Sequence, residues 1–263
     1  MLASGVDPAW RGIEPEPVSP RWTRVRVHGS TRVREGELLS PDPDLPEESR
    51  VVRLRLIEPR HMEARSLVIV LASWRDEDAK VRTRLVGPAV RAGVAVLIPG
   101  AAFYGGRRRA GQVGSAIRYV ADLIGMGRAT VTEARVLLAW ARTRYERIGV
   151  AGYSMGGQMA AMTAALCRWP VRFVGVATSV SPARVFFDGP LHADVASAPL
   201  GEGGLAKLRV IMERLNVLDL DPPCDVERAL LVGTRDDAIV PPADTRAIAR
   251  HWGVNPRWIH EVT

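Results

Sequence analysis

One serine in the sequence has neighbours that suit it to nucleophilic attack. Ser154 stands in the stretch Gly152-Tyr153-Ser154-Met155-Gly156-Gly157, after a short apolar run at residues 148–151 and before a helix-forming stretch at residues 158–167. A strand, then Gly-x-Ser-x-Gly, then a helix forms a nucleophile elbow, in which the serine occupies a strained turn and exposes its hydroxyl. Gly152 and Gly156 lack a Cβ, so the strand and the helix can approach closely. A glycine-rich turn without chemistry is the alternative, and the flanking strand and helix favour the nucleophile.

Attack by Ser154 would create an oxyanion, and backbone N–H groups are expected to stabilise it. The helix begins directly after the serine, so its free N–H groups and its dipole favour negative charge there. We expect the Met155 N–H to be one donor. The second is expected from Ser73 or Trp74, in the polar loop after the apolar run at residues 67–71. A continuous apolar run of this kind is typical of a central parallel strand that is covered on both faces.

A carboxylate that could orient a histidine base follows the predicted strand at residues 229–232. Asp236 and Asp237 are adjacent there, ahead of an apolar pair and a proline. The acid of such a site accepts the imidazole N–H and stabilises the imidazolium. The chain order of serine before aspartate fits this role. The pattern alone does not decide which of the two aspartates is the acid. The aspartate that is not the acid would be a turn residue or a helix N-cap.

The histidine base has no clear candidate. The chain has five histidines, His28, His61, His192, His251 and His260. His260 is the nearest to the expected position, but it lies inside the last predicted strand, at residues 257–262, where side chains alternate above and below the sheet. We therefore expect no histidine of this chain to lie within hydrogen-bonding reach of Ser154.

The elements that would position these residues alternate between strands and helices. Buried strands are predicted at residues 67–71, 94–98, 148–151, 173–177 and 229–232, and helices at residues 79–91, 129–145, 206–215 and 243–252. This alternation predicts an α/β fold with a mostly parallel central sheet and helices on both faces. An irregular insertion is expected at about residues 183–225. The length of 263 residues suits one large domain.

The first fifty residues are expected to differ from the rest. They contain seven prolines and are predicted to form an extended arm with a short strand at residues 24–28. The domain itself would occupy residues 51–263. It would begin with a half-buried strand near a sheet edge at residues 51–57, where apolar and basic residues alternate.

Composition excludes several classes of protein. The hydrophobic fraction of 47% and the charged fraction of 25% are ordinary for a globular protein, and no apolar run approaches the 18 residues of a membrane span. The first residues do not resemble a signal peptide, and Cys167 and Cys224 show no metal-ligand spacing, so we expect a cytoplasmic protein with reduced thiols.

The net charge of +7 comes from scattered arginines. No nucleic-acid motif accompanies them, so nucleic acid is not expected as a partner. The one tight run, Arg107-Arg108-Arg109, could form an active-site wall for an acidic head group or a solvated basic loop. The sequence is compatible with peripheral contact with a membrane. It contains no pattern that predicts the oligomeric state.

The residues quoted above place the chain in the α/β-hydrolase fold, and more narrowly it resembles the family of α/β-hydrolase domain-containing protein 18. The resemblance covers residues 67–263. It is carried by Phe103-Tyr104-Gly105-Gly106-Arg107, Gln112, Ser115, Val120, Asp122-Leu123, Met126-Gly127, Leu138, Trp140, residues 152–157 and Met159-Ala160. The family's Asp-Ala-x-x-Pro matches Asp237-Ala238-Ile239-Val240-Pro241 and selects Asp237. The resemblance implies a serine hydrolase (carboxylesterase or lipase-like) that acts on small-molecule or lipid esters, with no metal or organic cofactor. It also implies that the insertion forms a lid.

Two departures from the family pattern affect the functional prediction. A histidine usually follows Ser-Met-Gly-Gly in the family, whereas this chain has Gln158. The family also continues after its last strand with Gly-Gly-His, whose histidine is the base, while this sequence ends at Thr263, where that loop would begin. We therefore expect the base to be missing from a truncated chain. The alternative is a non-catalytic relative that uses the pocket to bind an acyl ligand or a protein partner.

Overall fold

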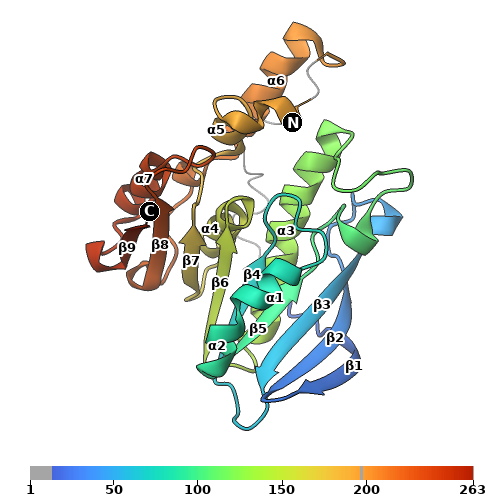
Figure 1. The fold of residues 1–263 in the computed structure, drawn as a ribbon, viewed down its shortest axis with the longest axis vertical. Helices are drawn as coiled ribbons and strands as arrows, with labels where there is room; N and C mark the ends of the chain where they lie inside the picture. The colour runs from blue at the N-terminus through green and yellow to red at the C-terminus, as the bar shows by residue number, and fades with distance from the viewer. Residues whose placement is uncertain (1–13, 196–197, 263) are drawn as a thin grey trace. The chain divides into compact units, whose positions relative to one another are not determined.

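The computed structural model describes residues 14–195 and 198–262. Within them the strands form one sheet with the order β1-β2-β3-β5-β4-β6-β7-β8-β9 (Figure 1). The strands are β1 (Arg21–His28), β2 (Thr31–Leu39), β3 (Val51–Pro59), β4 (Ser66–Leu71), β5 (Val94–Pro99), β6 (Arg147–Tyr153), β7 (Arg172–Val176), β8 (Ala229–Thr234) and β9 (Ile259–Val262). β4 runs parallel to β5, and β8 runs parallel to both β7 and β9. The predicted mostly parallel sheet is confirmed.

The N-terminal part contributes more to the sheet than its prolines suggest. β1 contains the predicted short strand, and β2 is a second strand that pairs antiparallel with β1 and with β3. The chain from residue 21 to residue 40 contains no proline, so both strands can donate their full set of backbone hydrogen bonds. Gly29, at φ +54°, makes the turn between them.

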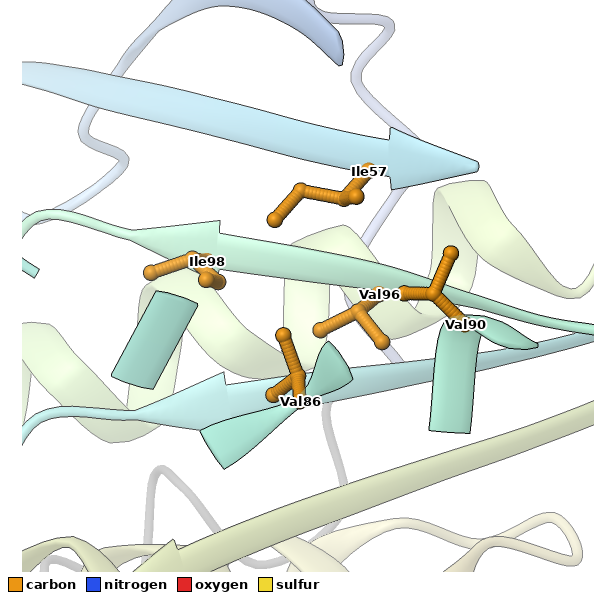
Figure 2. Close-up of a cluster of buried hydrophobic side chains, with 5 residues drawn as sticks. All are labelled: Ile57, Val86, Val90, Val96 and Ile98. Atoms are coloured by element: carbon orange, nitrogen blue, oxygen red, sulfur yellow. The ribbon is translucent and has the colours of Figure 1, made fainter. Parts of the chain in front are cut away.

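The chain divides into two compact units, one built from Pro15–Ala151 and the other from Gly152 onward. The first unit holds α1 (Lys80–Leu85), α2 (Gly87–Arg91) and α3 (Val120–Ala141). The predicted helix at residues 79–91 is broken into α1 and α2, with Pro88 in the first turn of α2. α2 covers one face of the sheet through a buried cluster in which Val86 and Val90 pack against Ile57, Val96 and Ile98 (Figure 2).

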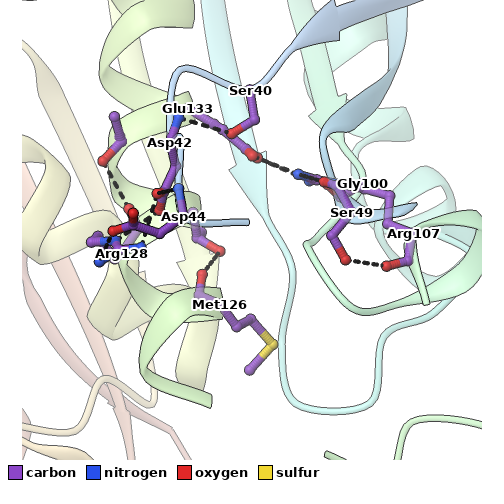
Figure 3. A network of polar contacts seen from close by, with 11 residues as sticks. Ser40, Asp42, Asp44, Ser49, Gly100, Arg107, Met126, Arg128 and Glu133 are labelled. Carbon is purple, nitrogen blue, oxygen red and sulfur yellow. Dashed lines mark hydrogen bonds and ion pairs between the residues drawn. The ribbon is translucent and has the colours of Figure 1, made fainter. Parts of the chain in front are cut away.

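α3 holds the proline-rich segment that joins β2 to β3. Arg128 on α3 donates to both carboxylate oxygens of Asp42, at 2.8 and 2.9 Å, and pairs with Asp44 (Figure 3). The Asp42 side chain is almost fully buried. The segment therefore follows a fixed path, because its buried carboxylate needs this cation.

The second unit contains the parallel strands β7, β8 and β9. Its helices are α4 (Met155–Leu166), α5 (Pro182–Phe186), α6 (Gly201–Glu213) and α7 (Pro242–Trp252). α4 contacts β7, and α7 contacts β8. The insertion after β7 consists of α5, the 3₁₀ segment η4 (Pro190–Asp194), α6 and the 3₁₀ segment η5 (Val217–Asp219).

The insertion is closed at its base. The Val217 N–H donates to the Val180 carbonyl at 2.8 Å, so the two ends of the insertion meet. A small buried cluster of Ala177, Val185 and Val240, with Leu191 against it, packs the insertion onto the loop that follows β8.

Candidate active site

Ser154 occupies a strained position between β6 and α4. Its backbone has φ 53° and ψ −121°, a combination that residues with a Cβ rarely adopt. β6 ends at Tyr153 and α4 begins at Met155, so no other residue separates the strand from the helix. The Ser154 N–H donates to the Val176 carbonyl at 2.9 Å, and its carbonyl accepts from the Gln158 N–H at 3.1 Å. The serine side chain is half-buried.

Glycines permit the close approach of β6 and α4. A Cβ on Gly152 would lie 2.0 Å from the Gly156 carbonyl oxygen and 2.1 Å from its carbon. A Cβ on Gly157 would lie 2.7 Å from the Thr178 hydroxyl. Contacts this short do not occur between real atoms, so a larger residue at Gly152 requires the backbone to move.

Backbone hydrogen bonds connect the carboxyl ends of neighbouring strands at this edge. The Ser154 N–H meets the Val176 carbonyl of β7, and the Ala177 N–H meets the Val232 carbonyl of β8 at 2.8 Å. Open α/β sheets place their ligands at the carboxyl ends of parallel strands. The loop that carries Asp237 leaves β8 at this edge, so the serine and the aspartate follow strands that are separated only by β7.

The two candidate aspartates have different surroundings. One carboxylate oxygen of Asp237 accepts the N–H groups of Ile239 and Val240, at 2.8 and 2.9 Å, and the other accepts the Thr234 hydroxyl at 2.9 Å. Asp237 is half-buried, whereas Asp236 is exposed. The carboxylate of Asp237 is thus held in one orientation by its own loop.

Three of the five histidines belong to the unit that holds Ser154. His192 is exposed on η4, and the His251 Nε2 lies 2.9 Å from the Leu220 carbonyl oxygen. His260 lies inside β9, in register with Val232, and is exposed. Over residues 14–195 and 198–262, no histidine nitrogen is hydrogen-bonded to the carboxylate of Asp237.

Ser73 and Trp74, the predicted second oxyanion donors, lie in the loop that follows β4 in the other unit. The Ser73 carbonyl accepts the Asp76 N–H at 3.2 Å, which makes a tight turn. Arg75, which follows Trp74 within this turn, has φ +63°.

The three arginines of the basic run differ in burial. Arg107 is 2% exposed and forms a bidentate ion pair with Glu133, at 2.6 and 2.9 Å. Arg108 pairs with Glu77, and Arg109 pairs with Asp122. Each of the three arginines is therefore paired with a carboxylate of the same unit, and Arg107, which is buried, belongs to the core and not to a solvated loop.

The sequence did not indicate that two buried polar residues, Gln158 and Asp244, hold the insertion. Gln158, where the family usually has a histidine, is 3% exposed and donates to the Leu215 carbonyl at 3.0 Å. Asp244, in the first turn of α7, is 2% exposed and accepts from the Ser179 hydroxyl at 3.0 Å and the Val180 N–H at 3.1 Å. No periodicity marks either residue, because each contact joins segments that are far apart in the sequence.

No group of three or more histidine, cysteine, aspartate or glutamate side chains that could hold a metal ion occurs in the described part of the chain. Among the helices described, none combines the length and the apolar character needed to cross a membrane. Cys167, which is buried, and Cys224, which is exposed, are free cysteines.

Solved structures of esterases share this fold. An acetyl xylan esterase from Paenibacillus sp. R4 superposes with a TM-score of 0.68 at 14% identity, over 97% of this chain and 84% of that one. Acetyl xylan esterase 1 from Thermoanaerobacterium sp. gives 0.60 at 15% identity, over 96% and 88%. The rice cell wall degrading esterase LipA from Xanthomonas oryzae gives 0.58 at 13% identity, over 95% and 91%. At these identities the likeness shows the α/β-hydrolase fold.

A family model assigns the chain more narrowly. The model for alpha/beta hydrolase domain containing 18 matches residues 9–204, which is more than half of the chain and includes Ser154. The chain belongs to the alpha/beta hydrolase domain containing 18 family.

Proposed function

We propose that this protein is a serine hydrolase that cleaves carboxylic esters through Ser154. The observation that carries the proposal is the backbone of Ser154, held at φ 53° and ψ −121° directly before α4. Strain of this kind persists only where the surrounding structure enforces it, and it concentrates at functional sites. Here the close contact of β6 with α4 at Gly152 enforces it.

The proposed reaction has two halves. Ser154 Oγ attacks the ester carbonyl carbon while an imidazole base takes the hydroxyl proton, and the carbonyl oxygen becomes an oxyanion. The N–H of Met155, at the start of α4, stabilises that charge. Collapse of the tetrahedral intermediate breaks the bond between the carbonyl carbon and the alcohol oxygen. The departing alcohol receives the proton from the imidazolium. Water then attacks the acyl-enzyme by the same route and releases the acid. An alcohol in place of water would give acyl transfer.

Asp237 is proposed as the acid that orients the base. Its fixed carboxylate and its place after β8 support this choice over the exposed Asp236. We assign the base to none of the five histidines. The His251 Nε2 is hydrogen-bonded to the Leu220 carbonyl oxygen. His260 lies within the strand β9 and not in a loop. Imidazole in solution should therefore act as the base.

The direct experiment measures release of p-nitrophenol from acetyl, butyryl and octanoyl esters, with and without imidazole. We expect slow turnover alone and faster turnover with imidazole, in both cases abolished in Ser154→Ala. Ser30→Ala, an exposed serine in the β1–β2 turn, is the matched control and should behave as wild type. Equal rates for wild type and Ser154→Ala across all three esters would refute the proposal. Turnover without imidazole that disappears in His260→Ala would instead assign the base to His260.

A non-catalytic acyl-binding protein is the second candidate. The observation in its favour is that the hydrogen bonds to Asp237 come from Thr234, Ile239 and Val240, all in or beside its own loop. This candidate predicts that a fatty acid or an ester protects the protein against thermal unfolding while Ser154-dependent turnover is absent at every imidazole concentration. Binding with turnover excludes it.

A further inference from the structure

The two cysteines of the chain meet in the fold. Cys167 and Cys224 are 57 residues apart in the sequence, and the Cys224 Sγ lies 3.5 Å from the Cys167 carbonyl oxygen. We propose that they form a redox pair, in which a mild oxidant converts the two thiols into one disulfide and a thiol reductant restores them. Both residues belong to the unit that begins at Gly152, and the inference does not depend on the proposed activity.

The two thiols differ in exposure, which gives them different roles. Cys167 is 2% exposed, whereas Cys224 is exposed. An oxidant in solution therefore reaches Cys224 first, and Cys167 is sheltered from oxidants and from alkylating reagents. Redox-sensor cysteines are solvent-accessible and often stand beside a resolving cysteine. We assign Cys224 as the thiol that is oxidised first and Cys167 as the thiol that resolves it.

With hydrogen peroxide as the oxidant, the reaction has two steps. The Cys224 thiolate attacks one peroxide oxygen, the O–O bond breaks, and Cys224 becomes a sulfenic acid while one water molecule leaves. The Cys167 thiolate then attacks the sulfenic sulfur, an S–S bond forms, and the S–O bond breaks to release a second water molecule. The two thiols have then lost two electrons and two protons, and one peroxide has become two water molecules.

The separation of the two residues suits a disulfide. A carbonyl oxygen lies about 2.4 Å from the Cα of its own residue, so the Cys224 Sγ stands within about 6 Å of the Cys167 Cα. Disulfides join residues whose Cα atoms are about 4.4–6.8 Å apart, so little movement of the backbone is required. A rotation of the Cys167 side chain and a small shift of the segment that holds Cys224 would bring the two sulfur atoms together.

The segment before Cys224 can make that shift. Residues 221–223 have irregular backbone, and two of the three are prolines, which have no N–H to donate elsewhere in the fold. The Arg228 N–H donates to the Asp225 carbonyl at 3.0 Å, and this bond holds the chain only after Cys224. Cys224 can therefore move without breaking a helix or a strand.

The disulfide would close the insertion covalently. Cys167 follows the last residue of α4, and Cys224 lies shortly before the 3₁₀ segment η6 (Val226–Arg228) and β8. The chain between the cysteines thus contains β7 and the whole insertion from α5 to η5. The base of the insertion is otherwise held by hydrogen bonds such as that between Val217 and Val180. A cross-link over so long a loop restricts the unfolded chain, so we expect the oxidised protein to be the more stable form.

The test treats the reduced, folded protein with hydrogen peroxide, then unfolds it and alkylates the remaining thiols with N-ethylmaleimide. We expect the intact mass to fall by about 2 Da without alkylation, and unreduced tryptic peptides 148–168 and 215–228 to be joined. Before unfolding, the oxidised protein should show a Tm about 5 °C or more above that of the reduced protein, the usual size of effect for a disulfide in a chain of this length. Dithiothreitol should reverse both changes.

Two variants separate the roles of the cysteines. Cys224→Ser changes one atom at an exposed position, so the fold should be unaffected. After oxidation it should show neither the cross-link nor the rise in Tm, and its Cys167 should stay reduced. In Cys167→Ala the oxidised Cys224 has no resolving partner, so dimedone should trap its sulfenic acid. The same adduct should be much weaker in wild type, because Cys167 consumes the sulfenic acid.

Three results would overturn the inference. The first is Cys224 oxidised beyond the sulfenic acid, or joined to a second molecule, while Cys167 remains reduced. The second is a disulfide that forms only when the oxidant is added in urea, since the fold would then not bring the thiols together. The third is a cross-linked protein whose Tm equals that of the reduced form, which would refute the closure of the insertion.

Discussion

Gly152→Ala should unfold or distort the serine turn, because the new Cβ has no space. The Cβ would lie 2.0 Å from the Gly156 oxygen, 2.1 Å from the Gly156 carbon and 2.6 Å from the Gly157 nitrogen. All three are backbone atoms, so no side-chain rotation can relieve the contacts. The end of β6 and the start of α4 must separate by more than an ångström, and overpacking of this severity costs about 3 kcal/mol or more.

The assay is equilibrium unfolding in urea, with Gly203→Ala as the matched control. Gly203 lies in α6 of the same unit, and a Cβ there meets nothing within 4 Å. Alanine in a helix is favoured over glycine, so this control should gain about 0.5–1 kcal/mol. The two substitutions are chemically identical and should move the free energy of unfolding in opposite directions. A Gly152→Ala protein within 0.5 kcal/mol of wild type would refute the reasoning about the turn.

Three further predictions concern charges and protons. In the imidazole-supported assay, Asp237→Asn should lose more kcat than Asp236→Asn, because only the Asp237 carboxylate is proposed to orient the base, and equal losses would reverse the assignment. Glu133→Gln should destabilise the protein by about 3 kcal/mol in urea unfolding, because Arg107 stays charged and buried, and a loss below 0.5 kcal/mol would contradict this. Burial raises the pKa of Tyr104 from 10.0 to about 12, so its contribution to stability is complete below pH 10 and is lost as the pH rises toward 12. Wild type should thus lose about 2 kcal/mol more than Tyr104→Phe over this range, and parallel pH profiles would contradict the shift.

The sequence was most informative where one local pattern decides the structure. The apolar run at residues 67–71 became the central strand β4, and the Gly-x-Ser-x-Gly stretch became the turn between β6 and α4. In each case the requirement is local, either a strand covered on both faces or two backbones in contact.

The sequence was least informative about contacts between distant segments. The prolines before residue 50 obscured β2, since only the distance between Pro20 and Pro41 shows that a hairpin fits. The run Arg107-Arg108-Arg109 looked like surface charge, because Glu133, Glu77 and Asp122 are remote in the chain. Pairing between remote charges depends on the folded arrangement and leaves no local pattern.

The most direct test of the central claim is the site at which a fluorophosphonate reacts, mapped by peptide mass spectrometry. A serine activated for attack forms a covalent adduct with such a probe, whereas ordinary serines do not. We predict one adduct, on Ser154, which forms faster with imidazole and is absent from Ser154→Ala. Undiminished labelling of Ser154→Ala, or an adduct on any other serine of the wild type, would contradict the account.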